Sequence, residues 1–568
     1  MSASAETRGM WAALIGCMLA CVAAAVGAYV LAAYSWSQFA QYRSPYATLP
    51  VPTELVSVVP TPSPAIVRRV VLVIVDGLRE DVSRSSMPTL NTLRSYGSDL
   101  SITVPQPSLS FPNWTTILSG APPTISGVTT NGFHGREPAP TLIDVARAAG
   151  YPVVVVGPTD FTPLFGVRAG HGVSLHPWPT YTYVSSLLIG DALNLSKEAS
   201  TGLVVVHLPD LDDAGHEFGA ASAQYRQTAS HIDADLGRLV AGLQGTGTTF
   251  IITADHGHAN AGGHGGWEPE VLHVPGVFAG SGIRLSKGTG DLDQIAPTVS
   301  VLLGLNDPAY AEGQALRSVI DTDNEGVFGA DVAHHIALDA HYVGVVTGVE
   351  PSAADLLGDG GPDAAVGQAT ARRLSAERFA RITPALLVCL VLLIVLAAIA
   401  VTSWRALVAA VVGTGAYYAV YEALFFGVHG YRWSLSIINT EQLLKTFMMW
   451  PMGEAAFAAL VGVAVAAAVY PLLRREPKGP QVPQYLPGHL ALGAVTVLVV
   501  LGSLALEVAW YLLWWGAQVV WTLPDLRMSF KYDLDLVQMT AVGGVVLVAP
   551  VVTYLIGLYH PRVRGGVG

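Results

Sequence analysis

Four apolar runs in this sequence end in side chains that can bind a metal. The run at 248–252 leads into ThrAlaAspHisGlyHis at 253–258, where a carboxylate and an imidazole are adjacent. The other three lead into loops that carry Asp76, Asp160, and the set Asp210, Asp212, Asp213 and His216. Short continuous apolar runs are typical of strands buried on both faces of a parallel sheet. Because ligands of such sheets bind at the carboxyl ends of the strands, the pattern predicts a metal site there.

Ser110 is the candidate nucleophile. The segment from Pro112 is expected to form a short helix with proline near its first position, which leaves Ser110 just before the helix. A helix N-terminus favours an anion, and its backbone N–H groups can receive a phosphate. Direct bonding to a metal would lower the pKa of the hydroxyl and make it a nucleophile. The alternative is that Ser110 is only a helix cap.

Two further motifs supply enough ligands for two ions. Asp212 and His216 stand four residues apart in AspAspAlaGlyHis, and His264 lies in the glycine-rich run GlyGlyHisGlyGly shortly after Asp255 and His256. Any one of these residues alone would be explained by a structural partner. Together they form an acid-rich and an imidazole-rich set, which is enough to hold two divalent ions ~4 Å apart.

The composition indicates that one part of the chain lies in lipid and another part in water. Of its 568 residues 51% are hydrophobic and only 13% are charged, against roughly 25% in a soluble domain. The net charge of −12 argues against a nucleic-acid partner. Residues 66–320 alternate apolar runs with helical or loop segments, which predicts an α/β domain with a mostly parallel central sheet and helices on both faces. The three cysteines lie in apolar stretches, so this domain must be held by its own core.

The remaining segments predict a multi-span membrane protein. Residues 1–41 contain an uncharged stretch at 10–33 that is long enough to span a bilayer; a cleaved signal peptide is the alternative. A proline-rich linker follows at 42–65, and a Gly-, Asp- and Ala-rich connection at 321–383 ends in a basic juxtamembrane segment. The multi-span region is 384–560, with five candidate spans: 384–403, 406–427, 452–473, 488–513 and 537–559.

Loop charges predict the orientation. If the chain alternates, one side of the membrane receives seven basic residues: Arg8, Arg405, Arg474, Arg475, Lys478, Arg562 and Arg564. By the positive-inside rule both termini are cytoplasmic and the α/β domain faces outward, at the plasma membrane. The outer loops 428–451 and 514–536 are rich in tryptophan. This indicates an interfacial aromatic belt, or a lid for a lipid headgroup.

The motifs resemble a known family. ValAspGlyLeuArg (75–79), SerPheProAsn (110–113), AspAspAlaGlyHisGluPheGly (212–219), AspHisGly and GlyHisGlyGly occur in the order of the phosphodiesterase branch of the alkaline phosphatase superfamily. SerPheProAsn resembles the nucleotide pyrophosphatase/phosphodiesterases. AspAspAlaGlyHis and the short interval from AspHisGly to GlyHisGlyGly look like the ethanolamine phosphate transferases of GPI-anchor assembly, which also carry a multi-span membrane region. The resemblance implies an alkaline-phosphatase-like fold over about 66–320.

The resemblance also implies roles for single residues. One zinc would be held by Asp76, Ser110, Asp255 and His256, and the other by Asp212, His216 and His264. Oxygen and imidazole ligands suit Zn²⁺, with Mn²⁺ as the alternative. Asn113 would donate to a phosphate oxygen, and His258, which stands where these families usually have methionine, would touch the substrate. The nucleophile is serine rather than the commoner threonine.

These features together predict a membrane-anchored, two-metal phosphodiesterase or phosphotransferase that forms a phospho-serine intermediate. Its expected substrate is a phosphate ester, lipid-linked or of phosphoethanolamine type, and its other partner is the lipid bilayer; no protein partner is evident. Nucleotide pyrophosphatase and phosphomonoesterase activities are the alternatives within the superfamily. A transporter with an appended regulatory phosphatase-like domain, or a catalytically dead binding domain, are the alternatives from other classes.

Overall fold

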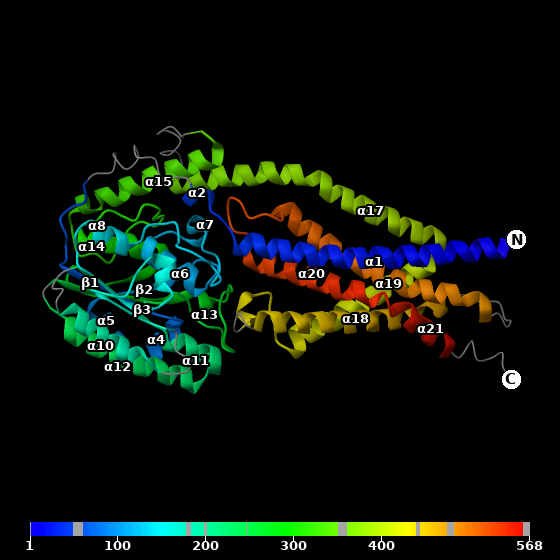
Figure 1. Ribbon diagram of the computed structural model, residues 1–568, viewed down its shortest axis with the longest axis horizontal. Helices are drawn as coiled ribbons and strands as arrows, with labels where there is room; N and C mark the ends of the chain where they lie inside the picture. The colour runs from blue at the N-terminus through cyan, green and yellow to red at the C-terminus, as the bar shows by residue number, and fades with distance from the viewer. Residues whose placement is uncertain are drawn as a thin grey trace.

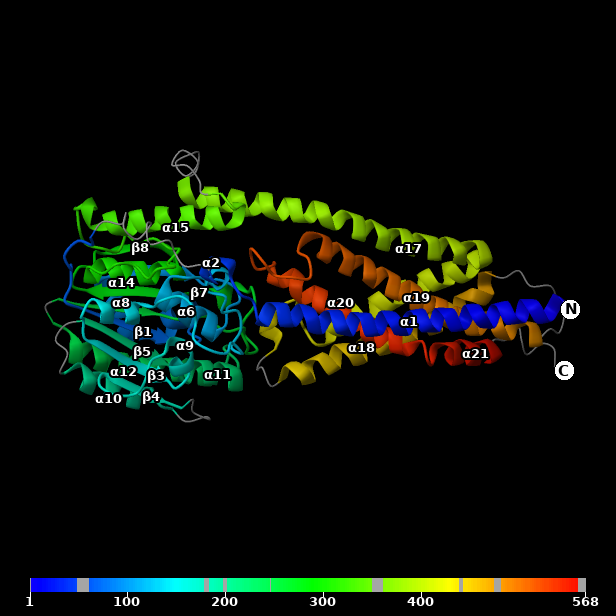
Figure 2. The same cartoon turned by 45° about the horizontal axis from the view of Figure 1, so that its top comes forward.

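The computed structural model describes residues 2–48, 61–177, 183–197, 202–245, 247–349, 361–438, 443–473 and 482–559. A globular α/β domain stands at one end of the molecule, and a bundle of long helices extends from it (Figure 1). Helix α1 begins at Ser2, and α21 ends at Tyr559, towards the far end of the bundle, away from the globular domain (Figures 1 and 2). The linker segment 49–60, the basic loop 474–481 and the tail 560–568 lie outside the described residues.

The globular domain is built on one sheet of eight strands in the order β4-β3-β5-β1-β6-β7-β2-β8. The pairs β3–β4, β3–β5, β1–β5, β1–β6 and β2–β8 are parallel, whereas β7 runs antiparallel to β6 and β2. The sheet is therefore mostly parallel, as the sequence predicts. The strands are β1 Arg69–Val75, β2 Ser98–Thr103, β3 Val153–Pro158, β4 Val173–His176, β5 Gly202–Leu208, β6 Thr248–Thr253, β7 His273–Gly280 and β8 Ser286–Asp291.

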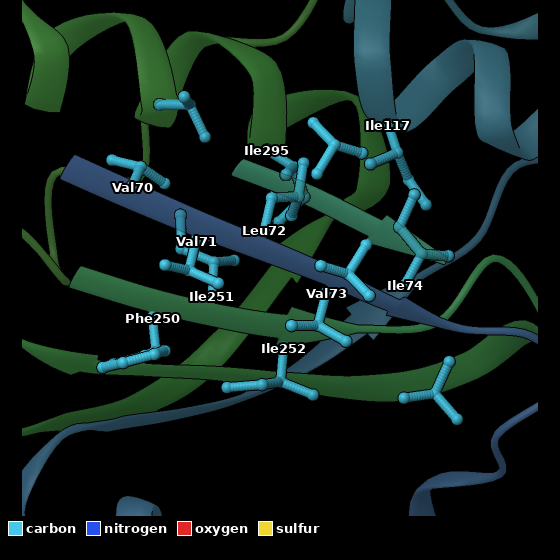
Figure 3. Close-up of a cluster of buried hydrophobic side chains, with 14 of the residues drawn as sticks. Val70, Val71, Leu72, Val73, Ile74, Ile117, Phe250, Ile251, Ile252 and Ile295 are labelled. Carbon is cyan, nitrogen blue, oxygen red and sulfur yellow. The ribbon is translucent and has the colours of Figure 1, made fainter. Parts of the chain in front are cut away.

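The central strands form because β-branched residues cover both of their faces. All seven residues of β1 are buried, as are all residues of β5 and β6. Figure 3 shows β1 side chains packed against β6 and against Ile117 and Ile295 from the helical layer. Burying a branched side chain of this kind stabilises the fold by about 1.5–3 kcal/mol. Such burial on both faces requires helices above and below the sheet.

Helices cover both faces of the sheet (Figure 1). One layer contains α6 (Ser110–Ser119), α8 (Leu142–Ala148) and α14 (Ile295–Leu303). The other layer contains α4 (Glu80–Ser86), α5 (Pro88–Tyr96), α10 (Ser185–Ser196) and α12 (Ala223–Leu243). The predicted architecture, a mostly parallel central sheet with helices on both faces joined to apolar helices, is confirmed.

The sheet topology brings three chemistry-bearing loops together. Strands β5, β1 and β6 are neighbours, and the register pairs Val75 with Leu208 and Ile74 with Thr253. Their carboxyl ends therefore lie side by side and lead into Asp76, into α11 (Asp210–Phe218) and into Asp255. The loop after β3, with Asp160, belongs to the next strand outward.

Four described helices are long and apolar enough to span a membrane: Leu14–Ala40, Ala364–Val428, Phe447–Leu473 and Leu490–Trp514. A bent pair, Leu526–Val545 with Ala549–Gly557, adds a fifth candidate. The predicted span 384–403 falls in α17 (Gly361–Glu422), which is interrupted at Ser403 with φ −160° and ψ 80°. The predicted span 406–427 begins in α17 and ends in the π-helical segment Ala423–Val428. The chain doubles back at the far end of α17 (Figures 1 and 2).

The outer loops are shorter than the sequence predicts. Helix α18 begins at Leu443 and α20 at Leu526, inside the segments expected to be loops. The early start of α20 places Lys531 in the bundle, where its ammonium pairs with Asp535 at 2.6 Å and with Glu507. Sequence hydropathy misses residues 526–536 of this helix because charged residues lower the apolar average. The mutual pairing of these charged residues makes their burial tolerable.

The N-terminal helix is a packed member of the bundle. Helix α1 (Ser2–Ala40) lies against α19 (Val482–Trp514) and α20 (Leu526–Val545). Cys21 is fully buried in this interface, opposite Gly543. The close approach of the two backbones is possible because Gly543 carries no side chain.

Candidate functional site

Ser110 is the first residue of α6, after Leu109 as the N-cap. The helix therefore begins two residues earlier than predicted from Pro112, and it ends at Gly120 in the left-handed conformation. The Ser110 Oγ lies 3.3 Å from the Nε2 of His256. The hydroxyl thus sits at a helix N-terminus, where backbone N–H groups and the helix dipole favour an anion, and beside an imidazole.

Asp76, Asp255 and His256 form the first cluster of candidate ligands. The Nε2 of His256 lies 3.4 Å from Asp76 Oδ1 and 3.6 Å from Asp255 Oδ2. All three side chains are fully buried. The structure therefore brings together the four residues that the sequence assigns to the first ion, Ser110 included.

Three groups that the sequence does not single out hold this cluster in place. The Trp114 indole N–H donates to Asp255 Oδ2 at 2.7 Å, and the Gly77 N–H donates to the other Asp255 oxygen at 3.1 Å. The His207 Nε2 lies 2.8 Å from Asp76 Oδ2. A polar residue inside the apolar run of β5 is the one sequence signal that points to His207. Such partners orient metal ligands and raise their basicity.

Asp212, His256, His258 and His264 form the second cluster of candidate ligands, and His216 adjoins it. The Nε2 of His216 lies 3.3 Å from Asp212 Oδ2 and 3.2 Å from the Nε2 of His264. The Nε2 of His264 is in turn 3.6 Å from Asp212 Oδ1. Its ring stacks on that of His256, with centroids 3.7 Å apart, so the two clusters adjoin. The residues predicted for the second ion are thus also brought together.

His258 contacts a candidate ligand. Its side chain is fully buried, and its Nε2 is 2.6 Å from Asp212 Oδ1. The backbone at Gly77, with φ +71°, makes room for this ring: a Cβ there would lie 2.9 Å from it. Because 46 residues separate His258 from Asp212, sequence spacing does not show this pairing. The predicted contact of His258 with the substrate stays a prediction.

Asn113 lies one helical turn after Ser110, on the same face of α6. It is fully buried, and its Nδ2 donates to the Pro107 carbonyl at 3.4 Å. Its Oδ1 has no hydrogen-bond partner among the residues that the structure describes. The amide therefore has one N–H left for another acceptor. Its predicted contact with a phosphate oxygen stays a prediction.

Burial and like charge shape the acids of the site. Burial, and then the neighbouring carboxylates of Asp255 and Asp212, raise the pKa of Asp76 well above its usual range. Burial also raises the pKa of Asp255, against the opposing effect of His256. Burial would raise the pKa of Asp212 too, but His216 and His258 outweigh it and hold that pKa well below its usual value. The Asp76 and Asp255 carboxyl groups therefore resist ionisation unless a cation binds beside them.

These residues fit a pair of divalent cations. The Oδ1 of Asp76 is buried, faces His256, and has no hydrogen-bond partner in the part of the chain that the structure describes. Among the described residues, every ion-pair partner of Asp76, Asp212 and Asp255 is a histidine. Buried carboxylates without lysine or arginine, next to imidazoles, are the donor set that Zn²⁺ or Mn²⁺ takes.

Acid is expected to destabilise the metal-free protein through His258. Burial lowers the pKa of His258 from 6.5 to about 4. A histidine with a lowered folded pKa stabilises the fold fully above pH 6.5, and this contribution is lost as the pH falls towards 4. In His258→Gln the side chain at this position no longer takes up a proton between pH 6.5 and 4. Between pH 6.5 and 4 the EDTA-treated wild type should therefore lose about 1.4 kcal/mol more per pH unit than the variant. Denaturation midpoints of both full chains in detergent measure this, and parallel pH curves would contradict it.

Comparison with known proteins is consistent with this geometry. Residues 70–146 and 158–273 match the family described as type I phosphodiesterase / nucleotide pyrophosphatase. The catalytic subunit of human GPI ethanolamine phosphate transferase 2 is 25% identical over 280 residues, which are 45% of this chain and 28% of the relative. A 2,3-bisphosphoglycerate-independent phosphoglycerate mutase of Roseobacter denitrificans is 32% identical over 145 residues, 24% of this chain and 27% of the relative.

Each of these two matches thus spans less than a third of the relative's length. Among solved structures, human ectonucleotide pyrophosphatase / phosphodiesterase 5 aligns with a TM-score of 0.39 at 15% identity, over 45% of this chain and all of that one. The family resemblance of the globular domain rests on the family model and on the curated relatives. On their evidence, the resemblance of the globular domain to the phosphodiesterases of the alkaline phosphatase superfamily, which its motifs indicate, is confirmed.

Proposed function

We propose that this protein is a membrane-anchored, two-metal phosphodiesterase or phosphotransferase that works through a phospho-serine intermediate. The observation that carries the proposal is the position of Ser110. Its hydroxyl lies at the N-terminus of α6, 3.3 Å from His256, which links it to Asp76 and Asp255. A nucleophile, an anion-binding helix end and a buried ligand cluster therefore meet at one point.

The proposed ligands are divided as the sequence suggests. Asp76, Ser110, Asp255 and His256 would hold one ion, and Asp212, His216 and His264 the other. When bound, the ions would lower the pKa of the Ser110 hydroxyl and offset the charge that develops on the phosphate. Zn²⁺ suits the mixed oxygen and nitrogen donors, and Mn²⁺ is the second choice.

The chain's own residues account for the group transfer. The Ser110 Oγ forms a bond to phosphorus as the bond to the leaving alcohol oxygen breaks. The N–H groups at the start of α6 face the phosphate during this step. In the second half of the reaction, the oxygen of an acceptor hydroxyl forms the new bond to phosphorus, and the bond between phosphorus and Ser110 Oγ breaks. If the acceptor is water the protein is a hydrolase; if it is a lipid or glycan hydroxyl, a transferase.

Diesters are expected to react faster than monoesters. A monoester carries one more charged oxygen, which a cationic side chain must meet. Arg79, the arginine nearest to Asp76 in sequence, is already bonded to Asp81 at 2.8 Å, to Asn260 at 2.6 Å and to the His258 carbonyl. We expect kcat/KM for a p-nitrophenyl phosphodiester to exceed that for p-nitrophenyl phosphate. A tenfold preference for the monoester, ~1.4 kcal/mol, would instead indicate a phosphomonoesterase.

A lipid-linked or phosphoethanolamine-type substrate is the proposed substrate class. The globular domain rests directly on the membrane helices: Trp267, three residues after His264, donates its indole N–H to the Trp433 carbonyl at 2.8 Å. The site thus stands close to the bundle, within reach of a headgroup at the bilayer surface. The matched relatives named as GPI ethanolamine phosphate transferases agree with this class.

The proposed topology places the globular domain on the extracytoplasmic side of the plasma membrane, with both termini in the cytoplasm. Helix α1 begins, and α21 (Ala549–Tyr559) ends, at the end of the bundle opposite the globular domain (Figure 1), which supports one side of the membrane for both termini. A reporter active only in the cytoplasm should give no signal when fused after Ser200 and a clear signal after Arg564. Signal from the first fusion alone would reverse the orientation.

A further inference from the structure

The loop that carries His264 is held from the membrane region. We call residues 262–268 the histidine loop. Residues 431–438 lie within the first of the two predicted outer loops, 428–451, and from here on the name outer loop means residues 431–438 alone. The Gly266 N–H donates to Ser436 Oγ at 3.0 Å, and the Ser436 hydroxyl donates to Glu268 Oε2 at 2.8 Å. The Trp267 indole N–H donates to the outer loop at the Trp433 carbonyl. One serine of the outer loop therefore joins two points of the histidine loop.

The contact between the outer loop and the histidine loop is buried and tightly packed. Ser434, Ser436 and Glu268 are all at most 3% exposed. A Cβ added to Gly266 would lie 1.8 Å from Ser434 Oγ and 2.5 Å from Ser436 Oγ, so a glycine is required there. Because Glu268 is buried, losing the Ser436 hydroxyl would leave a carboxylate oxygen without this donor, which is costly in a site that excludes water.

The histidine loop also contacts the segment that leads to the nucleophile. The His264 Nδ1 bonds to the Ser108 carbonyl at 2.9 Å, and the Ser108 hydroxyl donates to the Gly266 carbonyl at 3.0 Å. A Cβ at Gly265 would lie 2.9 Å from Leu109 and 3.3 Å from Leu435 of the outer loop. The outer loop, the histidine loop and the start of α6 thus form one packed unit.

Helix α20 supports this unit from below. The Arg527 guanidinium lies over the Trp267 ring, 4.9 Å from its centroid, and the Lys531 ammonium lies 5.5 Å from the centroid of Trp433. Arg527 and Lys531 are four residues apart and therefore share one face of the helix. Figure 1 shows the yellow segment around the start of α18 facing the globular domain beside α13 (Pro269–Leu272), which directly follows the histidine loop.

We propose that the outer loop completes the active site, with Ser436 as a positioning residue for His264. The inference rests on the proposed function in that His264 is taken as a metal ligand. Its Nδ1 is fixed by Ser108, and the chain on its other side is fixed by Ser436 and Trp433, so its Nε2 is directed at His216 and Asp212. The membrane region is then more than an anchor: the second ion site is fully formed only while the globular domain is docked on the bundle.

The first test needs neither metal nor substrate. Hydrogen exchange of the peptide spanning the histidine loop is measured in metal-free, full-length protein in detergent. Ser436→Ala should raise its exchange rate by about tenfold or more, because Gly266 loses its acceptor. Trp267→Phe, which removes the N–H donor together with the five-membered ring of the indole and keeps a six-membered ring beneath Arg527, should act in the same direction. The matched control is Ser503→Ala, whose hydroxyl bonds to Tyr418 inside the bundle.

The second test measures metal affinity. In Ser436→Ala the second divalent ion should bind about 10- to 100-fold more weakly in a chelator competition, the range found when a partner of a metal ligand is lost. Raising the Zn²⁺ concentration should restore most of kcat, which a misfolded site would not allow. The first ion should bind as in the wild type.

Unchanged exchange and unchanged metal affinity in both Ser436→Ala and Trp267→Phe would overturn the inference, because the globular domain would then hold the loop alone. If Ser436→Ala does not fold, Trp267→Phe decides the question by the same two measurements. A wild type that never binds a second ion would instead refute the two-metal function, and the exchange result would still stand or fall by itself.

Discussion

Replacing Ser110 with alanine is expected to abolish turnover while leaving the fold and the metal content intact. The change removes one oxygen, 3.3 Å from His256 Nε2, and leaves the N-terminal N–H groups of α6 in place. Loss of a catalytic nucleophile lowers kcat by about 10⁴- to 10⁶-fold. Steady-state hydrolysis of a p-nitrophenyl phosphodiester by the full chain measures the loss, and elemental analysis measures the metal.

Two controls accompany this variant. Ser110→Thr keeps a hydroxyl and should retain part of the activity. Ser119→Ala removes a buried hydroxyl from the far end of the same helix, where it bonds to the Thr115 carbonyl, and should leave kcat within a few-fold of the wild type. If Ser110→Ala kept near-normal kcat, water would be the nucleophile and the phospho-serine intermediate would have to be abandoned.

Replacing Asp255 with asparagine is expected to remove one of two bound ions and about 10³-fold of kcat/KM. The wild-type carboxylate accepts from Gly77 through one oxygen and from the Trp114 indole through the other. The asparagine NH₂ must meet one of these donors, so the side chain loses a hydrogen bond as well as its charge. A metal centre contributes several kcal/mol of transition-state stabilisation, and about 4 kcal/mol corresponds to the factor given.

The matched control for this change is Asp160→Asn. Asp160 also follows a strand of the sheet, but the strand is β3, outside the trio β5, β1 and β6. Elemental analysis should give two ions per chain for the wild type and Asp160→Asn, and one for Asp255→Asn. One ion in the wild type, unaffected by Asp212→Ala or His216→Ala, would refute the two-metal assignment.

Much of the site could be predicted because its chemistry is local in the sequence. The apolar runs that become β1, β5 and β6 are buried on both faces, and the acids and histidines follow directly where those strands end. In a parallel sheet such ends necessarily share one edge. The fold class, the apolar helices and the meeting of Asp76, Asp212 and Asp255 could therefore be predicted without coordinates.

The partners of those residues were decided only by the tertiary structure. His258 lies against Asp212, and Trp114 and His207 hold Asp255 and Asp76 from 141 and 131 residues away in sequence. The contact of Ser436 with Gly266 spans 170 residues. A buried carboxylate must find a donor, but nothing in its own neighbourhood along the chain specifies which one. Strand order and the docking of the domain on the membrane helices make that choice, because they determine which distant side chains come within hydrogen-bonding distance.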